Sequence, residues 1–187
     1  CAQLAAWRDQ GLAVRVSVNV SALQFHQRDF ADTVEDVLRQ ARIEPDRLEL
    51  EITESVLMRD YAAAQRTLRR LAELGVSVVL DDFGTGTSSL PYLQELPIRA
   101  IKIDRTFVAG LELRGPGPAG GSAPTVRAMV GLGRAFGFEV IAEGIETREQ
   151  RDFLRGIGVP TTRFAEVSGL DALTRVVRDV GRPCVLK

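Results

Sequence analysis

The sequence predicts an α/β fold in which parallel strands alternate with covering helices. Short apolar runs rich in β-branched residues alternate along the chain with segments whose apolar residues recur at helical spacing. Only a few residues connect each run to the next segment, which is typical of a parallel sheet with helical crossovers. The positions of polar residues along the strands then distinguish an open sheet from a barrel.

Length and composition favour one globular domain over residues 1–187. The chain has 187 residues, 45% of them hydrophobic, and a formal net charge of -1. Interspersed charges argue against a DNA- or RNA-binding surface, so any nucleotide partner is expected to be small.

The sequence also bears on location. No apolar run approaches the ~18 residues that span a bilayer, so we expect no membrane insertion in this segment. Cys1 and Cys184 form no metal or redox spacing, which fits a reducing cytosol. We expect this segment to lie in the cytoplasm. That location is compatible with a parent protein that is tethered to a membrane. Because the first residue is Cys within a predicted helix, we expect the parent protein to be longer.

The first half of the chain contains three predicted helices and two predicted strands. They are a helix at residues 1–10, a strand at Val14–Val20, a helix at Phe30–Ala41, a strand at Leu48–Ile52 and a helix capped by Asp60 that ends at Leu74. The first strand alternates valines with Arg15, Ser17 and Asn19. Asp60 is a good N-terminal cap, and Gly75 suits the left-handed residue that closes a helix.

The second half continues the same alternation. The predicted elements are a strand at Val76–Leu80, a short helix at Ser88–Leu93, a strand at Ala100–Ile103, a helix at Thr125–Phe136, a strand at Phe138–Ala142, a helix at Thr147–Leu154, a strand near Arg163–Val167 and a helix at Asp171–Val180. The segment Arg114–Pro124 is rich in Gly and Pro, which predicts a flexible loop.

Polar residues stand at or near the carboxyl ends of five successive predicted strands: Asn19, Glu51, Asp81, Lys102 and Glu143. Each shares a strand side with other polar or small residues, whereas the opposite sides are apolar, as strands covered by helices require. Barrel active sites are built at this face from several strands at once, while an open sheet gathers its ligands around one crevice. The pattern therefore predicts an incomplete TIM-type (β/α) barrel with about six of its eight units.

The hexapeptide Asp81-Asp82-Phe83-Gly84-Thr85-Gly86 places two carboxylates directly after the predicted strand Val76–Leu80. Repulsion between neighbouring carboxylates is relieved by a divalent cation, and oxygen ligands suit magnesium, manganese or calcium. An Asx turn or a helix cap is the alternative role for such a pair.

Five ordered motifs resemble those of the EAL family: Ser17-Val18-Asn19-Val20-Ser21, Glu49-Leu50-Glu51-Ile52-Thr53-Glu54-Ser55, the aspartate hexapeptide, Lys102-Ile103-Asp104-Arg105-Thr106-Phe107-Val108 and Ala142-Glu143-Gly144-Ile145-Glu146-Thr147. The resemblance is clear over residues 1–158, and residues 159–187 diverge. Members of that family are barrel phosphodiesterases that hydrolyse cyclic di-GMP to the linear dinucleotide. The resemblance therefore implies a cyclic di-GMP partner, two Mg²⁺ or Mn²⁺ ions, and a possible homodimer or attached signalling domains.

The family pattern also implies roles for individual residues. The metal ligands would be Asn19, Glu51, Asp81, Asp82 and Glu143. Catalytic roles would fall to Lys102, Glu143 and Asp82, with Lys102 positioning the attacking water. Glu54 would anchor the loop that carries the aspartates, and Asp104 and Glu146 would support the ligands. Ordinary alternatives are an ion pair of Lys102 with Asp104 or Asp81, and a helix-capping role for Glu54.

Departures from the family pattern leave the activity open. The glutamate of the Glu-Ala-Leu signature, a first-strand metal ligand, has no counterpart in the sequence. Arg163 and Phe164 stand where the family has Gln-Gly and an aromatic, and Thr87 replaces a Tyr. One hypothesis is a phosphodiesterase whose upstream strands lie outside this sequence. A second is an inactive module that binds cyclic di-GMP or a protein partner, and a third is an unstable fragment with exposed sheet edges.

Overall fold

The computed structural model describes residues 1–86, 90–112, 120–160 and 185–186. Within these ranges, parallel strands form one sheet in the order β7-β4-β3-β2-β1-β8. The strands are β1 (Arg15–Asn19), β2 (Leu48–Thr53), β3 (Ser77–Phe83), β4 (Ala100–Ile103), β7 (Glu139–Ala142) and β8 (Val185–Leu186). A separate antiparallel pair consists of β5 (Leu111–Glu112) and β6 (Gly120–Gly121). The predicted α/β class and partial TIM-type barrel are confirmed.

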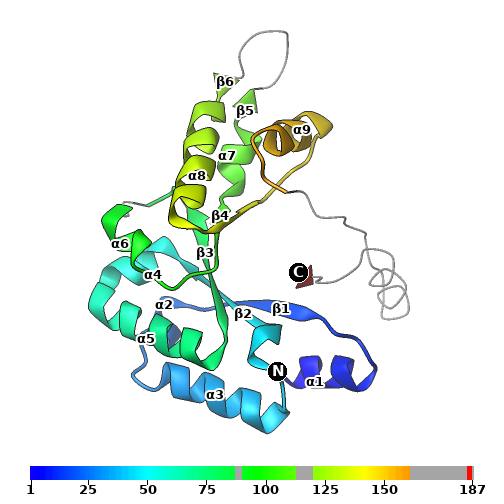
Figure 1. Ribbon diagram of the computed structural model, residues 1–187, viewed down its shortest axis with the longest axis vertical. Coiled ribbons are helices and arrows are strands. Elements are labelled where there is room, and N and C mark those ends of the chain that lie inside the picture. The colour runs from blue at the N-terminus through cyan, green and yellow to red at the C-terminus, as the bar shows by residue number, and fades with distance from the viewer. Residues whose placement is uncertain (87–89, 113–119, 161–184, 187) are drawn as a thin grey trace.

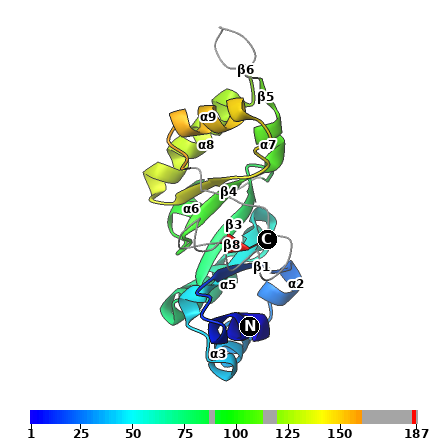
Figure 2. The same ribbon diagram turned by 90° about the vertical axis from the view of Figure 1, so that its right-hand side faces the viewer.

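Helices cover one side of this curved sheet (Figures 1 and 2). Helix α4 packs on β2 and β3, α5 on β3, and α8 on β4 and β7. The described helices are α1 (Ala2–Asp9), α2 (Ala22–Phe25), α3 (Phe30–Ala41), α4 (Glu54–Arg59), α5 (Tyr61–Leu74), α6 (Leu90–Gln94), α7 (Arg105–Ala109), α8 (Ala123–Phe136) and α9 (Arg148–Gly156), with a 3₁₀ turn at Pro45–Arg47.

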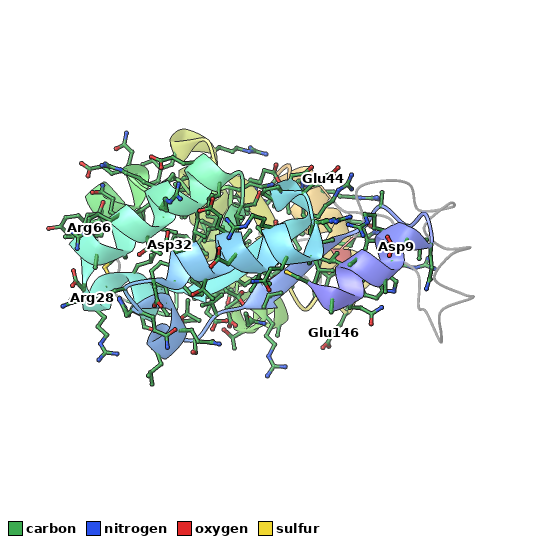
Figure 3. All side chains as sticks on the ribbon, turned by 90° about the horizontal axis from the view of Figure 1, so that it is seen from below. Asp9, Arg28, Asp32, Glu44, Arg66 and Glu146 are labelled. Atoms are coloured by element: carbon green, nitrogen blue, oxygen red, sulfur yellow. The ribbon has the colours of Figure 1, made fainter. Side chains whose placement is uncertain are left out.

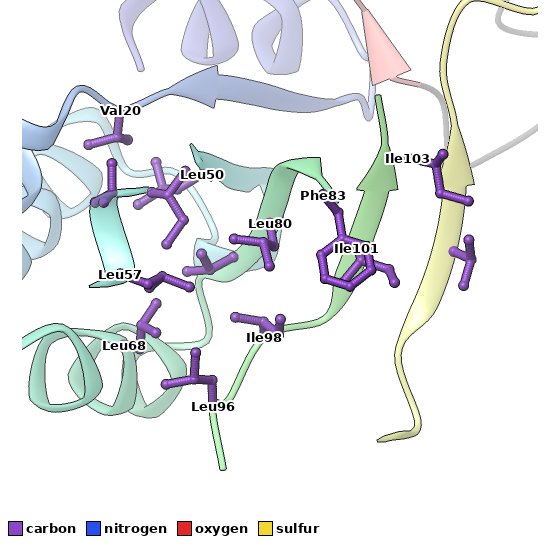
Figure 4. Close-up of a cluster of buried hydrophobic side chains, with 14 of the residues drawn as sticks. Val20, Leu50, Leu57, Leu68, Leu80, Phe83, Leu96, Ile98, Ile101 and Ile103 are labelled. Atoms are coloured by element: carbon purple, nitrogen blue, oxygen red, sulfur yellow. The ribbon is translucent and has the colours of Figure 1, made fainter. Parts of the chain in front are cut away.

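The hydrophobic core lies between the sheet and these helices. Leu50, Leu80 and Ile101 project from β2, β3 and β4, and Leu68 faces them from α5 (Figure 4). Leu68 and Leu80 are fully buried. Because each buried Leu contributes about 1.5–3 kcal/mol, this layer fixes which side of every strand faces the helices. The polar side chains of the same strands must then face the opposite side.

Helix ends follow the expected signals. The Asp60 carboxylate accepts a hydrogen bond from the Ala63 N–H at 3.0 Å, and Gly75 closes α5 with φ 87°. The bounds predicted for Phe30–Ala41 and for Ala100–Ile103 are confirmed at both ends.

Several local predictions are wrong. Asp81 and Asp82 do not follow the strand but lie within β3, which continues to Phe83. The expected loop at Arg114–Pro124 ends early, because Gly120–Gly121 forms β6 and Ala123 begins α8. Short helices α2, α4 and α7 were not predicted, since each spans at most six residues and has no full apolar stripe.

Some predictions fall outside the described residues. These are the strand near Arg163–Val167, the helix at Asp171–Val180, the substitutions at Thr87, Arg163 and Phe164, and the start of the helix expected from Ser88. The sixth strand of the described sheet is instead β8, which pairs in parallel with the free edge of β1.

Charged residues cover the helical surface, as the side chains of Arg28, Asp32 and Arg66 show (Figure 3). No described helix has both the length and the apolar character needed to cross a bilayer.

A polar network ties the amino ends of four strands together on the side of the sheet away from these helices. Glu49, with a side chain only 4% exposed, accepts hydrogen bonds from the Ser17 hydroxyl and from Arg99 Nη1, both at 2.5 Å. The other guanidinium nitrogen of Arg99 lies 2.7 Å from Glu139 Oε2. Arg99, just before β4, thus connects β2 with β7.

We expect Arg99→Met to lower the free energy of unfolding by about 2 kcal/mol in urea denaturation. The substitution leaves the buried Glu49 carboxylate without its cation, and the partial exposure of Arg99 keeps the loss below that of a fully buried pair. The double variant Arg99→Met/Glu49→Gln is the control, because it removes the unpaired charge and should regain most of the loss. Equal stability of Arg99→Met and the wild type would contradict the structural role.

Candidate active site

Lys102 lies at the centre of the candidate site. Its Nζ is 2.9 Å from Glu51 Oε2, 3.0 Å from Asp81 Oδ1 and 2.8 Å from Glu143 Oε1. The Lys102 side chain is 4% exposed, and exposure rises through Glu51 and Asp81 to 23% at Glu143. The cluster is therefore buried at its base and open on the Glu143 side.

Parallel pairing brings these residues together from strands far apart in the sequence. Asn19 of β1 is the register partner of Glu51 of β2, so their side chains project from the same side of the sheet. Lys102 pairs with Ile141 of β7, two residues before Glu143, whose N–H donates to the Ile103 carbonyl at 3.2 Å. Four of the five strand-end residues thus meet, as the phase of the sequence predicted.

A β-bulge places both aspartates opposite Lys102. Leu80 pairs with Ile101 and Phe83 pairs with Ile103, so Asp81 and Asp82 together face the single residue between them on β4. Asp82 adopts φ 54°, in the left-handed region that non-glycine residues seldom occupy. A bulge redirects a side chain without ending the strand, which is how two consecutive residues both reach the site.

Asp82 and Asp104 form a second carboxyl pair beside the cluster. Burial and the neighbouring Asp81 raise the pKa of Asp82, with further contributions from Asp104 and Glu143. Hydrogen bonds from the hydroxyl and the N–H of Thr106 lower the pKa of Asp104. These opposite directions make Asp82 the more readily protonated carboxyl group of the pair.

Lys102 is held in its protonated form. Burial on its own disfavours the ammonium, but hydrogen bonds to Glu143, Glu51 and Asp81 outweigh it and raise the pKa of Lys102 above its usual value. A protonated amine has no lone pair to accept a proton. Lys102 can therefore act as a fixed positive charge and hydrogen-bond donor, and not as a general base. Of the two ion pairs considered for it, the one with Asp81 forms, whereas Asp104 bonds to Thr106 and Asp82 instead.

The loop after β3 is enclosed by its neighbours. A Cβ added at Gly86 would lie 2.7 Å from the Glu54 carboxylate, and one added at Gly84 would lie 3.2 Å from the Phe107 ring. Gly84 also has φ 96°. Glu54 is buried at the first position of α4, so it contacts the loop and begins a helix at the same time.

Two of the remaining site residues are exposed, unlike the buried Lys102. Asn19 is exposed at the end of β1, and Glu146 is exposed in the loop before α9. The sequence analysis did not predict the contact between Asp82 and Asp104, because Asp104 lies after β4 at the N-cap of α7.

The donor set suits a hard divalent cation by type, because carboxylate and amide oxygens are the ligands that such ions take. Three carboxylates, those of Glu51, Asp81 and Glu143, surround one ammonium, and Asp82 lies beside them with a pKa raised by burial and by the neighbouring carboxylates. Among the described residues, however, no three His, Cys, Asp or Glu side chains are arranged to hold a metal ion. Three of the carboxylates are directed at the Lys102 ammonium instead.

Comparison with known proteins identifies the family. The family model described as "EAL domain" matches residues 1–162. The chain belongs to the EAL domain family. Its curated relatives include the cyclic di-GMP phosphodiesterase PA2567 of Pseudomonas aeruginosa, 40% identical over 157 residues, which cover 84% of this chain and 26% of that protein. An uncharacterized signaling protein of Caulobacter vibrioides is 47% identical over 156 residues, covering 83% of this chain and 18% of the relative.

Solved EAL structures share the fold. The PaMucR phosphodiesterase in complex with c-di-GMP superimposes with a TM-score of 0.75 at 43% identity, covering 84% of this chain and 62% of that one. The EAL domain of Mycobacterium smegmatis DcpA gives a TM-score of 0.76 at 38% identity, covering 85% and 70%. This chain thus spans about a quarter or less of the length of these curated relatives. It covers most of the solved DcpA domain.

We expect Lys102→Met to lower the free energy of unfolding by about 3–5 kcal/mol, because it leaves three neighbouring carboxylates without their shared cation. Urea denaturation without divalent cations measures the loss. The matched control is Lys102→Met/Glu51→Gln, which removes the most buried of the three charges and should be more stable than the single variant. If Lys102→Met is as stable as the wild type, Lys102 does not hold the cluster together.

Proposed function

We propose that this chain forms the substrate site of a metal-dependent phosphodiesterase that hydrolyses cyclic di-GMP to the linear dinucleotide. The supporting observation is that Glu51, Asp81 and Glu143 converge on Lys102 at the carboxyl ends of the strands in a chain of the EAL family. The named relatives support the substrate. Because the chain spans 26% or less of the curated relatives described above, the activity of the whole protein is part of this proposal.

In this proposal Mg²⁺ or Mn²⁺ is held by Asn19, Glu51, Asp81, Asp82 and Glu143. When bound, such ions stabilise the negative charge that develops at phosphorus and make water a stronger acid. Lys102, a permanent cation, holds Glu51, Asp81 and Glu143 in place and offsets part of the negative charge that a phosphodiester would meet. Glu54 holds the loop that carries the aspartates, and Asp104 orients Asp82. Glu146 would support the ligands from the loop after Glu143.

Binding without hydrolysis is the second candidate function. One observation favours it: the Lys102 ammonium already occupies the point on which three carboxylates converge, and a cation must compete with it for their oxygens. A module of this kind would bind cyclic di-GMP or a protein partner and act in signalling through that binding. It would not hydrolyse the nucleotide.

Millimolar Mg²⁺ or Mn²⁺ should raise the melting temperature of the wild-type chain, because an ion that binds only the folded state stabilises it. Glu51→Gln and Asp81→Asn should reduce or abolish the rise. Glu95→Gln, which removes an exposed carboxylate elsewhere on the surface, is the matched control and should leave it intact. No rise in the wild type, or equal rises in all variants, would exclude a metal site at the cluster.

Incubation of the chain with cyclic di-GMP and Mn²⁺ should yield the linear dinucleotide. Chromatography of the reaction mixture measures its formation. Lys102→Met should lose this activity while its melting temperature rises more with Mn²⁺ than that of the wild type, since the carboxylates then have no competing ammonium. Saturable nucleotide binding without product would favour the second candidate function. If product forms equally fast in Lys102→Met, the proposed role of the lysine is wrong.

A further inference from the structure

An arginine-lined cleft lies between α8 and α9, in the helical layer that covers the sheet. Its volume is about 390 Å³, and it is shallow and open to solvent. Three arginines line it together with three glycines, and none of its lining residues is acidic: Arg127, Val130, Gly131, Arg134, Arg155, Gly156, Ile157 and Gly158. No residue of the Lys102 cluster belongs to this lining, so the cleft is a separate feature.

Two of the guanidinium groups are held in place by neighbours. The Cζ atom of Arg127 lies 4.8 Å from the centre of the Phe153 ring, which it stacks against. Arg134 donates from Nη2 to the Ile157 carbonyl at 2.7 Å, which also satisfies an acceptor at the end of α9. A guanidinium already fixed in orientation loses less rotamer freedom when it binds a ligand than one that moves freely in solvent.

Gly131 has no packing reason to be glycine. It lies inside α8, a Cβ added there would meet nothing within 4 Å, and its φ is not positive. Gly133, two residues on, differs, because its added Cβ would lie 2.5 Å from Val140. Glycine inside a helix is less favourable than alanine, so the bare backbone at Gly131 costs stability without serving the core. The bare backbone at Gly131 leaves room for a ligand to approach closely.

We propose that this cleft binds the phosphate group of a small phosphorylated molecule. Guanidinium groups match phosphate oxygens through paired, charge-assisted hydrogen bonds, and the positive charges of Arg127 and Arg134 favour an anionic ligand such as a phosphate monoester. The cleft is larger than one phosphate, which leaves room for the rest of the molecule along the backbone at Gly131. This site is independent of the proposed hydrolysis of cyclic di-GMP.

The test compares inorganic phosphate and a nucleoside monophosphate with sodium chloride at equal ionic strength, measured as a shift of melting temperature across a concentration series. Both phosphate ligands should give a saturable rise that chloride does not give. A rise with inorganic phosphate alone would still support the phosphate site and assign the free ion as its ligand. A response no larger than that to chloride would overturn the proposal.

Variants locate the binding. Arg127→Gln should raise the half-saturating concentration on the order of tenfold, as loss of a charge-assisted hydrogen bond predicts. Gly131→Ala should raise the melting temperature without ligand yet weaken the response to phosphate, which unfolding cannot mimic. Arg105→Gln, at an exposed arginine beside the Lys102 cluster, is the matched control and should respond like the wild type. Unchanged binding in both cleft variants, or loss in Arg105→Gln, would overturn the proposal.

Discussion

The buried ammonium of Lys102 is the constraint on which this end of the sheet depends. It lies within 2.8–3.0 Å of carboxylate oxygens from β2, β3 and the residue after β7. A charge with a side chain 4% exposed is tolerated only when it is paired and hydrogen-bonded. The carboxyl ends of these strands must therefore stay in register, because a slip of one residue would turn the acidic side chains toward the apolar helical layer.

The bulge in β3 follows from the same requirement. A regular strand would direct Asp81 and Asp82 to opposite sides, and the Asp82 carboxylate would enter the core on the side of Leu80. Instead, both face Lys102, and Asp82 pays for this with a backbone φ of 54°. Such strain costs on the order of 1–3 kcal/mol and persists where surrounding structure enforces it, as the enclosed glycines of the following loop do here.

Sequence periodicity was sufficient to predict the elements that bury one side against the core. Phe30–Ala41 was predicted to the residue because its apolar stripe and its ends agree, and the convergence of Glu51, Asp81, Lys102 and Glu143 followed from strand phase. The bulge could not be predicted, because it depends on pairing with β4 and leaves no mark in the spacing of β3. The role of Arg99 was not predicted for a related reason. Arg99 precedes β4, so the alternation of side chains along the strand does not indicate that its side chain pairs with Glu49.

Two charged layers lie on the side of the sheet away from the covering helices. They differ in whether their charges are balanced within the protein and in how far they are exposed to solvent. At the amino ends, Glu49 is 4% exposed and receives hydrogen bonds from both Ser17 and Arg99, so its charge is satisfied within the protein. At the carboxyl ends, the single ammonium of Lys102 meets three carboxylates, and burial together with these neighbouring charges raises the pKa of the adjacent Asp82. Exposure also increases there, to 23% at Glu143. Surplus negative charge that opens toward solvent is stabilised by an added cation or proton, whereas the satisfied layer gains nothing from either. By this charge argument, the proposed cation site lies in the carboxyl-end layer and not in the amino-end layer.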